Sequence, residues 1–313
     1  MLIMEKESKI YIAGHNGMVG SSILRILTDS GYKNLIFKDR KDLDLTRQAQ
    51  VEEFFSKERP DYVFLAAARV GGIKANMNHP AEFIHQNILI QDNIIHQSYV
   101  SGVKKFCFLG SCCIYPRECL QPMKEEYLMT GPLEPSNEGY AVAKISGLRM
   151  LQCYRKQYGF LGISIMPCNL YGTNDHYDLI NSHVLSAFVK RFVDAVDEGT
   201  ESITLWGSGK AKREFMHVDD AAKAIIFLME NYDSPEIINI GCGEDISIKE
   251  LANIVASQAG YKGKINWDTS KPDGMPRKCL DVSRMKALGF SPSITLEQGI
   301  KKTISEYRSI NAK

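Results

Sequence analysis

The chain has 313 residues, of which 44% are hydrophobic and 24% charged, a composition that excludes an intrinsically disordered protein. Its 38 basic and 37 acidic residues leave a net charge of +1, so we expect neither a nucleic-acid partner nor attraction to an anionic membrane. The longest apolar run, Val63 to Ala68, is far shorter than the ~20 residues of a membrane-spanning helix. Charged residues occupy the positions where a signal peptide carries its apolar segment, which predicts a cytoplasmic protein.

The eight cysteines and seven histidines form no metal-binding pattern, because neither a Cys-x-x-Cys pair nor a His-Glu-x-x-His motif occurs. We therefore expect no bound metal. A chain of this length without an export signal is also not expected to depend on disulfides. Most of the cysteines are predicted to be small, buried and inert. The adjacent pair Cys112 and Cys113 is the exception, because it follows a predicted strand.

The first 170 residues alternate short β-rich segments with longer helical patterns. Strands are predicted over 9–13, 34–37, 62–65, 105–109 and 163–167, and helices over 18–30, 49–58, 80–101 and 140–158. Apolar strands that alternate with helices are typical of a parallel sheet covered on both faces. We therefore predict an α/β fold, a doubly wound parallel (Rossmann) sheet, with a dinucleotide-binding domain over residues 1–170.

Beyond residue 170 the pattern is less regular. Helices are predicted over 184–196, 218–230, 247–259 and 296–307, and strands over 203–206 and 237–240. We expect residues 212–240 to return to the main sheet, and residues 171–211 and 241–313 to form a smaller C-terminal substrate-binding region. A small lobe over the carboxyl edge of a nucleotide-binding sheet would create a substrate cleft.

A glycine-rich turn follows the first predicted strand. Gly14 suits a tight turn, Gly17 a close approach of the backbone to a pyrophosphate, and Gly20 close packing of the next helix. The N-terminus of that helix offers free N–H groups and a positive dipole to phosphates. The position favours a dinucleotide site over a plain turn. The residues expected to contact the cofactor are Gly14, His15, Asn16, Gly17, Met18, Val19 and Gly20.

The second predicted strand ends in Lys38-Asp39-Arg40, where the adenosine ribose of a dinucleotide is expected. An acid there binds the 2′-hydroxyl of NAD, whereas Arg or Lys pairs with the 2′-phosphate of NADP. The three charges give a mixed signal. We take Arg40 as the candidate ligand of the 2′-phosphate, and a solvated charge cluster as the alternative.

Tyr140 is followed four residues later by Lys144, at the start of a predicted helix. Residues four apart share a helix face, so the ammonium is expected beside the phenol, where it would lower the pKa of the phenol. Such a phenol donates a proton to a carbonyl oxygen that is being reduced. Ser111, just past the fourth strand, could hydrogen-bond the same carbonyl. The spacing alone is no better than chance among 14 tyrosines, and its weight comes from this context.

Together these motifs resemble the extended short-chain dehydrogenase/reductases that act on nucleotide sugars. Within them, the chain is similar to the NADPH-dependent GDP-4-keto-6-deoxymannose 3,5-epimerase-4-reductases, which form GDP-L-fucose. The similar segments follow one another over nearly the whole chain, at 12–20, 66–73, 109–116, 134–141, 181–184, 213–220 and 271–278. The resemblance implies NADPH as cofactor and a GDP-sugar as substrate. It implies further cofactor contacts from Leu109, Gly110, Ser111, Lys144, Pro167, Asn169, Leu170 and His183.

The resemblance also implies a cysteine and a histidine as the epimerising pair, and Cys113 and His183 occupy those positions. A 4-keto group acidifies the protons on C3 and C5, which a thiolate can remove and an imidazolium can return to the opposite face. In an extended segment residues two apart point the same way, so we expect Ser111 and Cys113 to share a face and Cys112 to turn aside. The alternative is a buried, inert Cys113 and a His183 that caps a helix.

For the substrate, the resemblance indicates Arg191, Trp206, Arg213 and Asp273. The planar group of arginine binds two oxygens of a diphosphate, and Trp206 could lie against a base or sugar. A core position for Trp206 and a surface position for Arg191 remain alternatives. The chain departs from the family in two places, with Asn16 where an arginine is frequent and Cys112 where a second serine is frequent, and the first departure weakens the NADP assignment slightly.

Three other functions remain open. A related GDP-4-keto sugar, such as a deoxyheptose or dideoxyhexose, could use the same residues. The main rival within the class is a neighbouring nucleotide-sugar enzyme, such as a 4-epimerase or a 4,6-dehydratase. The dehydratase is disfavoured, because Ser111-Cys112-Cys113 stands where such enzymes carry a Thr-Asp-Glu or similar set. A nucleotide-sensing regulator without activity is disfavoured by the intact Ser111, Tyr140 and Lys144.

Apolar residues lie on more than one face of the predicted helices 80–101 and 140–158. A helix that is apolar beyond one stripe needs a second burial partner. By resemblance to the family, we expect two copies of the chain to pair these helices in a two-fold homodimer. The residues in question are Ile84, Ile88, Ile95, Leu148 and Leu151.

Overall fold

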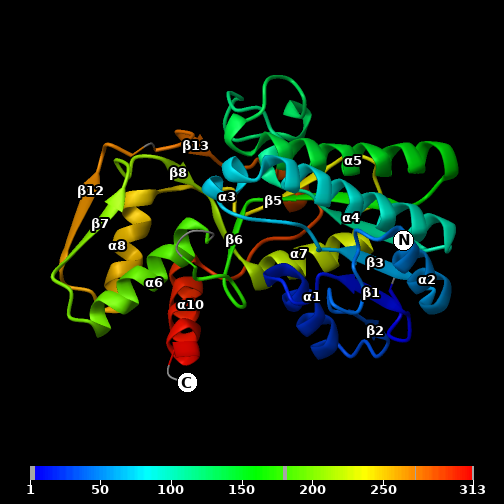
Figure 1. The fold of residues 1–313 in the computed structure, drawn as a ribbon, viewed down its shortest axis with the longest axis horizontal. Helices are drawn as coiled ribbons and strands as arrows, with labels where there is room; N and C mark the ends of the chain where they lie inside the picture. Colours follow the sequence, from blue (N-terminus) through cyan, green and yellow to red (C-terminus); the bar gives the residue numbers. More distant parts are fainter. Residues whose placement is uncertain (1–3, 179–181, 272, 312–313) are drawn as a thin grey trace.

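The computed structural model describes residues 4–178, 182–271 and 273–311, so Asn181 and Pro272 of the family-like segments lie outside the described residues. A six-stranded sheet forms its centre, in the order β10-β5-β4-β3-β1-β2, and every pairing in it is parallel (Figure 1). The strands are β1 (Ile10–Ala13), β2 (Leu35–Ile36), β3 (Tyr62–Leu65), β4 (Lys105–Leu109), β5 (Gly162–Pro167) and β10 (Ile238–Ile240). This is the predicted doubly wound fold.

Helices cover both faces of this sheet. On one side, α4 (Pro80–Val100) packs along α5 (Glu138–Tyr158) and beside α2 (Gln48–Glu58), and on the other α1 (Met18–Asp29) packs against α7 (Val218–Asn231) (Figure 1). The residues of β1, β3 and β4 are buried throughout, as expected for strands covered on both faces. These helix and strand bounds agree with the sequence predictions to within two residues.

A smaller lobe lies beside the sheet and has its own hydrophobic core. The core is formed by α6 (Val184–Asp197), α8 (Ile248–Ala259) and α10 (Leu296–Asn311), next to the paired strands β7 (Ser202–Trp206) and β12 (Lys264–Asp268) (Figure 1). Leu280, Val282 and Met285, which the sequence placed with this lobe, instead pack in the core of the main sheet. The segment that carries them includes α9 (Ser283–Ala287), which contacts β10.

Several short elements of two to six residues were not predicted, because segments this short carry little or no periodicity. Five of them form two small sheets, in which β6 (Asn169–Tyr171) pairs with β9 (Phe215–His217), and β8 (Lys212–Arg213) pairs with β11 (Ile246–Ser247) and β13 (Arg277–Lys278). The others are α3 (Ile73–Asn78) and the 3-10 turns η1 (Cys112–Ile114), η2 (Glu125–Tyr127) and η3 (Pro135–Asn137).

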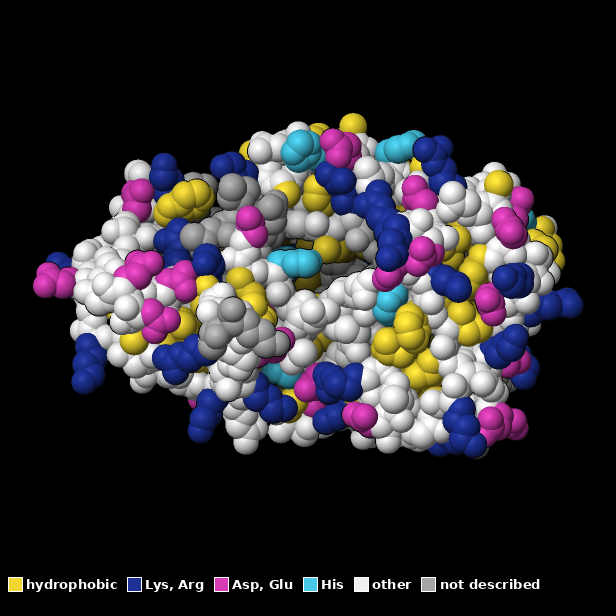
Figure 2. Space-filling model, turned by 60° about the horizontal axis from the view of Figure 1, so that its bottom comes forward, with side chains coloured by type: hydrophobic (Ala, Val, Ile, Leu, Met, Phe, Trp, Pro, Cys, Tyr) yellow, Lys and Arg dark blue, Asp and Glu magenta, His cyan; other side chains and the backbone are white. Residues whose placement is uncertain are grey.

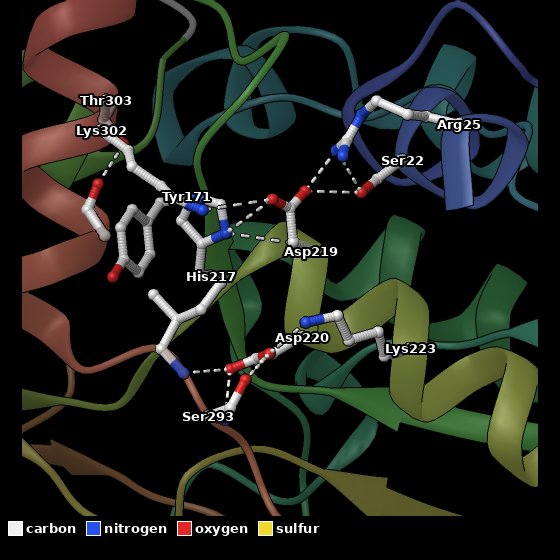
Figure 3. Close-up of polar contacts among 12 residues, drawn as sticks. Ser22, Arg25, Tyr171, His217, Asp219, Asp220, Lys223, Ser293, Lys302 and Thr303 are labelled. Carbon is white, nitrogen blue, oxygen red and sulfur yellow. Dashed lines mark hydrogen bonds and ion pairs between the residues drawn. The ribbon is translucent and has the colours of Figure 1, made fainter. Parts of the chain in front are cut away.

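Two carboxylates at the start of α7 connect the main sheet to the smaller lobe (Figure 3). Asp219 accepts a hydrogen bond from Ser22 Oγ at 2.9 Å and forms an ion pair with Arg25, both on α1, while Lys302 Nζ of α10 lies 3.8 Å away. Asp220 accepts a hydrogen bond from the backbone N–H of Ser293 at 2.7 Å. These contacts fix the position of one lobe against the other, and thereby the walls of any cleft between them.

The structure corrects one part of the dimer prediction. Ile95, Leu148 and Leu151 are buried within the chain itself, because α4 and α5 pack against each other and against the sheet. These three residues therefore need no second partner. Ile84 is partly buried, and Ile88 is 36% exposed.

Candidate active site

A cavity of about 680 Å³ opens at the carboxyl ends of β1, β3, β4 and β5. Its volume lies in the range of roughly 300–1,000 Å³ that is typical of ligand sites. The cavity extends over the switch point between β1 and β3, where open α/β sheets bind their ligands. Figure 2 shows a hollow near the centre of the molecule, with histidine and Lys/Arg side chains at its margin. Predicted site residues that line the cavity are Gly14, Asn16, Gly17, Met18, Val19, Gly20, Arg40, Leu109, Gly110, Ser111, Cys113, Tyr140, Lys144, Pro167, Asn169, Leu170 and His183.

The glycine-rich turn has the geometry of a pyrophosphate cradle. Gly14 has a φ of +88°, and a Cβ there would lie 2.6 Å from the backbone nitrogen of Ala67. A Cβ on Gly20 would lie 2.1 Å from the carbonyl oxygen of Gly14, so the helix could not approach the turn as it does. No side chain caps the N-terminus of α1 at Gly17, which leaves its first N–H groups available to a phosphate.

The charged residues Lys38, Asp39 and Arg40 follow β2, and they do not all line the cavity. Asp39 Oδ1 accepts a hydrogen bond of 2.6 Å from Asn16 Nδ2 and lies 3.4 Å from His15 Nε2, so its carboxylate faces the glycine-rich turn. Lys38 and Arg40 line the cavity, whereas Asp39 and His15 are not among its lining residues. The two cations thus face the end of the site where the sequence places the ribose. His15 instead packs on Phe37, with ring centroids 4.7 Å apart.

Tyr140, Lys144 and Ser111 meet on one wall of the cavity. Burial raises the pKa of Tyr140, the nearby Cys113 raises it further, and a hydrogen bond with Ser111 opposes the rise. The predicted lowering of this pKa by Lys144 is wrong for the protein alone. Its physical reason is that the Lys144 Nζ donates to the carbonyl oxygen of Leu109 at 2.8 Å and stands 5.7 Å from the centre of the tyrosine ring. The raised pKa keeps Tyr140 protonated, which is the form that a proton donor requires.

Lys144 is only 4% exposed, and burial lowers its pKa to about 8. A buried ammonium is costly unless it is paired, and within the described residues the carbonyl of Leu109 is the one hydrogen-bond acceptor found for Nζ. The amine is therefore partly neutral at slightly alkaline pH in the protein alone.

Cys113 lies at the cavity wall and is not fully buried, which argues against the inert alternative. The reasoning from an extended segment was wrong, because Cys112–Ile114 forms the 3-10 turn η1, and Ser111 Oγ caps it by accepting from the Cys113 N–H at 3.2 Å. Ser111 and Cys113 nevertheless both line the cavity. Cys112 is also at its wall but only 5% exposed.

The pKa of the Cys113 thiol is lowered below its ordinary value. A hydrogen bond with Cys112 is the main cause, and the positive charge of Lys278 adds to it, while burial opposes both. Lys278 Nζ lies 3.5 Å from Cys113 Sγ. Cys113 is therefore more readily ionised near neutral pH than an isolated cysteine.

His183 precedes α6 and lines the same cavity as Cys113, on the side of the smaller lobe. Its side chain is exposed and makes no capping hydrogen bond to the helix. The alternative role as a helix cap is therefore wrong. His176, which was not predicted, also lines the cavity.

The four predicted substrate residues lie on the smaller lobe and do not line the cavity described above. Asp273 accepts hydrogen bonds from the backbone N–H and the hydroxyl of Ser208, at 2.6 and 2.7 Å, which places it next to the strand end that carries Trp206. Arg213 donates to the carbonyl oxygen of Met275 at 2.7 Å. Trp206 is 64% exposed, so the core alternative is wrong for it. Arg191 bonds the carbonyl oxygen of Thr204 at 3.1 Å.

Sequence reasoning missed Lys278, the cation beside Cys113. It lies 165 positions further along the chain, and the pairing of β13 with β8 holds the strand that brings it against Cys113. No local pattern marks it, although it ends the family-like segment 271–278.

Comparisons with known proteins agree with this geometry. The profile of the NAD dependent epimerase/dehydratase family matches residues 10–241. The chain belongs to this family. It is 51% identical to GDP-L-fucose synthase 1 of Arabidopsis thaliana over 97% of this chain and 94% of the relative.

Two solved structures are similar over nearly their whole lengths. A GDP-6-OMe-4-keto-L-xylo-heptose reductase from C. jejuni superimposes with a TM-score of 0.94 at 37% identity, covering 98% of this chain and 99% of that one. A GDP-L-fucose synthetase from Naegleria fowleri bound to NADP has a TM-score of 0.92 at 28% identity, covering 100% and 97%. None of the helices in the described part of the chain combines the length and the apolar character of a membrane-spanning segment.

Proposed function

We propose that this protein is an NADPH-dependent epimerase/reductase that converts GDP-4-keto-6-deoxy-D-mannose to GDP-L-fucose. The observation that carries the proposal is the convergence of two catalytic sets on one cavity. Ser111, Tyr140 and Lys144 supply a carbonyl-reducing set, while Cys113 and His183 supply an acid–base pair for carbon protons. The relative from A. thaliana, at 51% identity, is a GDP-L-fucose synthase.

The cavity fits a dinucleotide that carries a 2′-phosphate. The turn at Gly14 and Gly20 would hold the pyrophosphate, and Arg40 and Lys38 would face the 2′-phosphate, since Asp39 is held by Asn16. The N. fowleri relative is bound to NADP. When bound, NADPH supplies the hydride for reduction of the 4-keto group.

Epimerisation is assigned to Cys113 and His183. The Cys113 thiolate would remove a proton from the carbon next to the 4-keto group, and Ser111 and Tyr140 would hydrogen-bond the oxygen on which negative charge develops. His183, across the cavity, would return a proton to the opposite face of the sugar. The low pKa of Cys113 suits it to the first of these steps.

Reduction is assigned to Tyr140, which would donate its phenolic proton to the 4-keto oxygen. Its raised pKa makes it a weak acid in the protein alone. Lys144, four residues away on α5, would stabilise the phenolate that forms, once a ligand draws its ammonium from the Leu109 carbonyl. Outside the cavity, Trp206, Arg213, Arg191 and Asp273 would bind the GDP portion.

The runner-up function is reduction of a 4-keto heptose, which the C. jejuni relative catalyses according to its name. The two are separated by incubating the pure protein with NADPH and GDP-4-keto-6-deoxymannose and identifying the product by NMR. We expect GDP-L-fucose. Recovery of unchanged keto sugar under conditions in which NADPH binds would overturn the proposal.

We propose in addition that the protein forms a two-fold homodimer through α4 and α5. After correction for the buried residues, Ile88 and Val100 on α4 and Val142 and Tyr158 on α5 remain exposed, between 36% and 59%. These two helices pack side by side, so a second copy of the chain could cover exposed apolar residues of both. Light scattering at micromolar concentration should give the mass of a dimer, and the mass of a monomer would contradict it.

The cytoplasmic location stays a prediction.

A further inference from the structure

A lysine from the smaller lobe contacts the cysteine that the proposed function uses as a base. Lys278 Nζ lies 3.5 Å from Cys113 Sγ, and the Lys278 side chain is partly buried. The roles given above to Cys113, His183 and Tyr140 leave Lys278 without a function. Its position against a nucleophilic sulfur therefore requires an explanation.

The backbone on both sides of Lys278 is held by hydrogen bonds. Lys278 pairs in register with Arg213 of β8, and its carbonyl oxygen accepts from the Glu214 N–H at 3.3 Å. The next residue, Cys279, donates its N–H to Gln121 Oε1 at 3.0 Å. The main chain of Lys278 is therefore held in place, and its partly buried side chain extends from there to Cys113.

The titratable and polar groups around Cys113 come from four elements. Its own turn contributes Cys112 and Ser111, α5 contributes Tyr140, and β13 contributes Lys278. Arg213 of β8 interacts with Cys112. Among these groups, Lys278 is the cation in contact with the Cys113 sulfur. Burial alone would lower the pKa of Lys278, but the neighbouring Cys112 and Cys113 raise it, so the lysine stays charged.

We propose that Lys278 is a positioning residue whose ammonium holds Cys113 as the thiolate for epimerisation; this rests on the proposed function. In that step the thiolate forms an S–H bond with the proton from carbon. The electron pair of the broken C–H bond forms a C=C bond to C4, and the π pair of the 4-keto group moves to its oxygen, which gives an enolate. Lys278 keeps its proton throughout and acts only through the sulfur.

The effect is large enough to matter at neutral pH. A cysteine with an ordinary pKa of about 8.5 is only about 3% thiolate at pH 7. An opposite charge within ~4–6 Å lowers the pKa of an acid by about 1–3, which would raise the thiolate fraction at pH 7 from about 3% to between roughly 24% and 97%. Without Lys278, the thiolate fraction of Cys113 should fall, although the hydrogen bond with Cys112 remains, and carbon-proton removal should slow with it.

The test is the pH dependence of Cys113 alkylation by iodoacetamide, read by tandem mass spectrometry that separates Cys113 from Cys112. The variant Lys278→Met should raise the midpoint for Cys113 by about one pH unit or more. Lys278→Arg should restore most of the shift, because it restores the positive charge. The matched control is Lys212→Met, which removes an exposed lysine of the paired strand and should leave the midpoint unchanged. An unchanged midpoint in Lys278→Met overturns the proposal.

Alkylation needs no substrate, so the outcome is separate from that of the proposed function. A raised midpoint together with a wild type that forms no GDP-L-fucose would retain the Lys278–Cys113 pair and reject the proposed function. An active wild type whose Lys278→Met variant exchanges carbon protons in D₂O with the same rate and pH profile would reject the role of Lys278 alone. Retained NADPH binding shows that the variant is folded, and Lys278→Gln replaces it if it is not.

Discussion

Asn16 and Asp39 are joined by a hydrogen bond of 2.6 Å between the amide nitrogen and the carboxylate, which links the glycine-rich turn to the end of β2. The contact has a consequence for cofactor choice. In dinucleotide sites an acid at this position binds the 2′-hydroxyl of NAD. Here the acid is bonded to the turn, and Lys38 and Arg40 line the cavity in its place.

We therefore expect Arg40→Ala to weaken NADPH binding by roughly 1.5–3 kcal/mol, as for a lost hydrogen bond to a charged group. NADH binding should barely change, because NADH lacks the 2′-phosphate. Fluorescence titration with each cofactor measures both affinities. Arg47→Ala, which removes an exposed arginine outside the cavity, is the matched control. Equal losses for the two cofactors would show that Arg40 does not contact the 2′-phosphate.

Tyr140→Phe should retain NADPH affinity and lose reduction by on the order of 10²–10⁴-fold, the usual contribution of a positioned acid. The substitution removes only the hydroxyl, so the cavity wall stays in place. Single-turnover oxidation of NADPH measures the loss. Reduction at a rate close to that of the wild type would mean that another group donates the proton.

The lowered pKa of Lys144 predicts a pH-dependent stability. The pKa is about 8 in the folded protein and about 10.4 in the unfolded chain, so between these values the unfolded state binds more protons. Stability should therefore rise with pH across this window, by up to about 3 kcal/mol relative to Lys144→Met. Urea unfolding of both proteins without cofactor, at pH 8 and pH 10, measures the difference. A constant difference over this range would contradict the pKa assignment.

The long periodic elements and the glycine-rich turn could be predicted because their signals are local. The alternation of buried strands with helices specifies the sheet. Gly14 and Gly20 mark the turn, because a Cβ at either position would collide with the neighbouring backbone. Contacts between distant segments could not be predicted. The placement of Leu280 in the main core and of Lys278 against Cys113 depends on strands of two residues, which have no periodicity.

The predictions about the pKa of Tyr140 and the placement of Cys113 had the same limit. The spacing of Tyr140 and Lys144 correctly placed both at one cavity, but the direction of the tyrosine pKa depends on burial and on the Leu109 carbonyl, which sequence does not show. Likewise, Ser111 and Cys113 reach the cavity through a 3-10 turn and not through the alternation of an extended strand.

The central claim is that separate residues perform epimerisation and reduction in one cavity, and the variant Cys113→Ser tests it. A serine hydroxyl is far harder to ionise than a thiol, so removal of carbon protons should nearly stop while Tyr140 remains in place. With NADPH, this variant should reduce the unepimerised sugar, giving a GDP-6-deoxy sugar that keeps the manno-type centres at C3 and C5. The buried neighbour gives the matched control, since Cys112→Ser keeps a hydrogen-bond donor beside Cys113 and should leave proton exchange largely unchanged.

The most direct measurement is deuterium exchange at C3 and C5 of GDP-4-keto-6-deoxymannose in D₂O without NADPH, followed by NMR. The wild type and Cys112→Ser should exchange both protons, and Cys113→Ser should exchange neither. Loss of exchange in Cys112→Ser alone would show that Cys112, and not Cys113, is the base. Full exchange in both variants would contradict the role of Cys113, and no exchange in the wild type would leave a plain reductase.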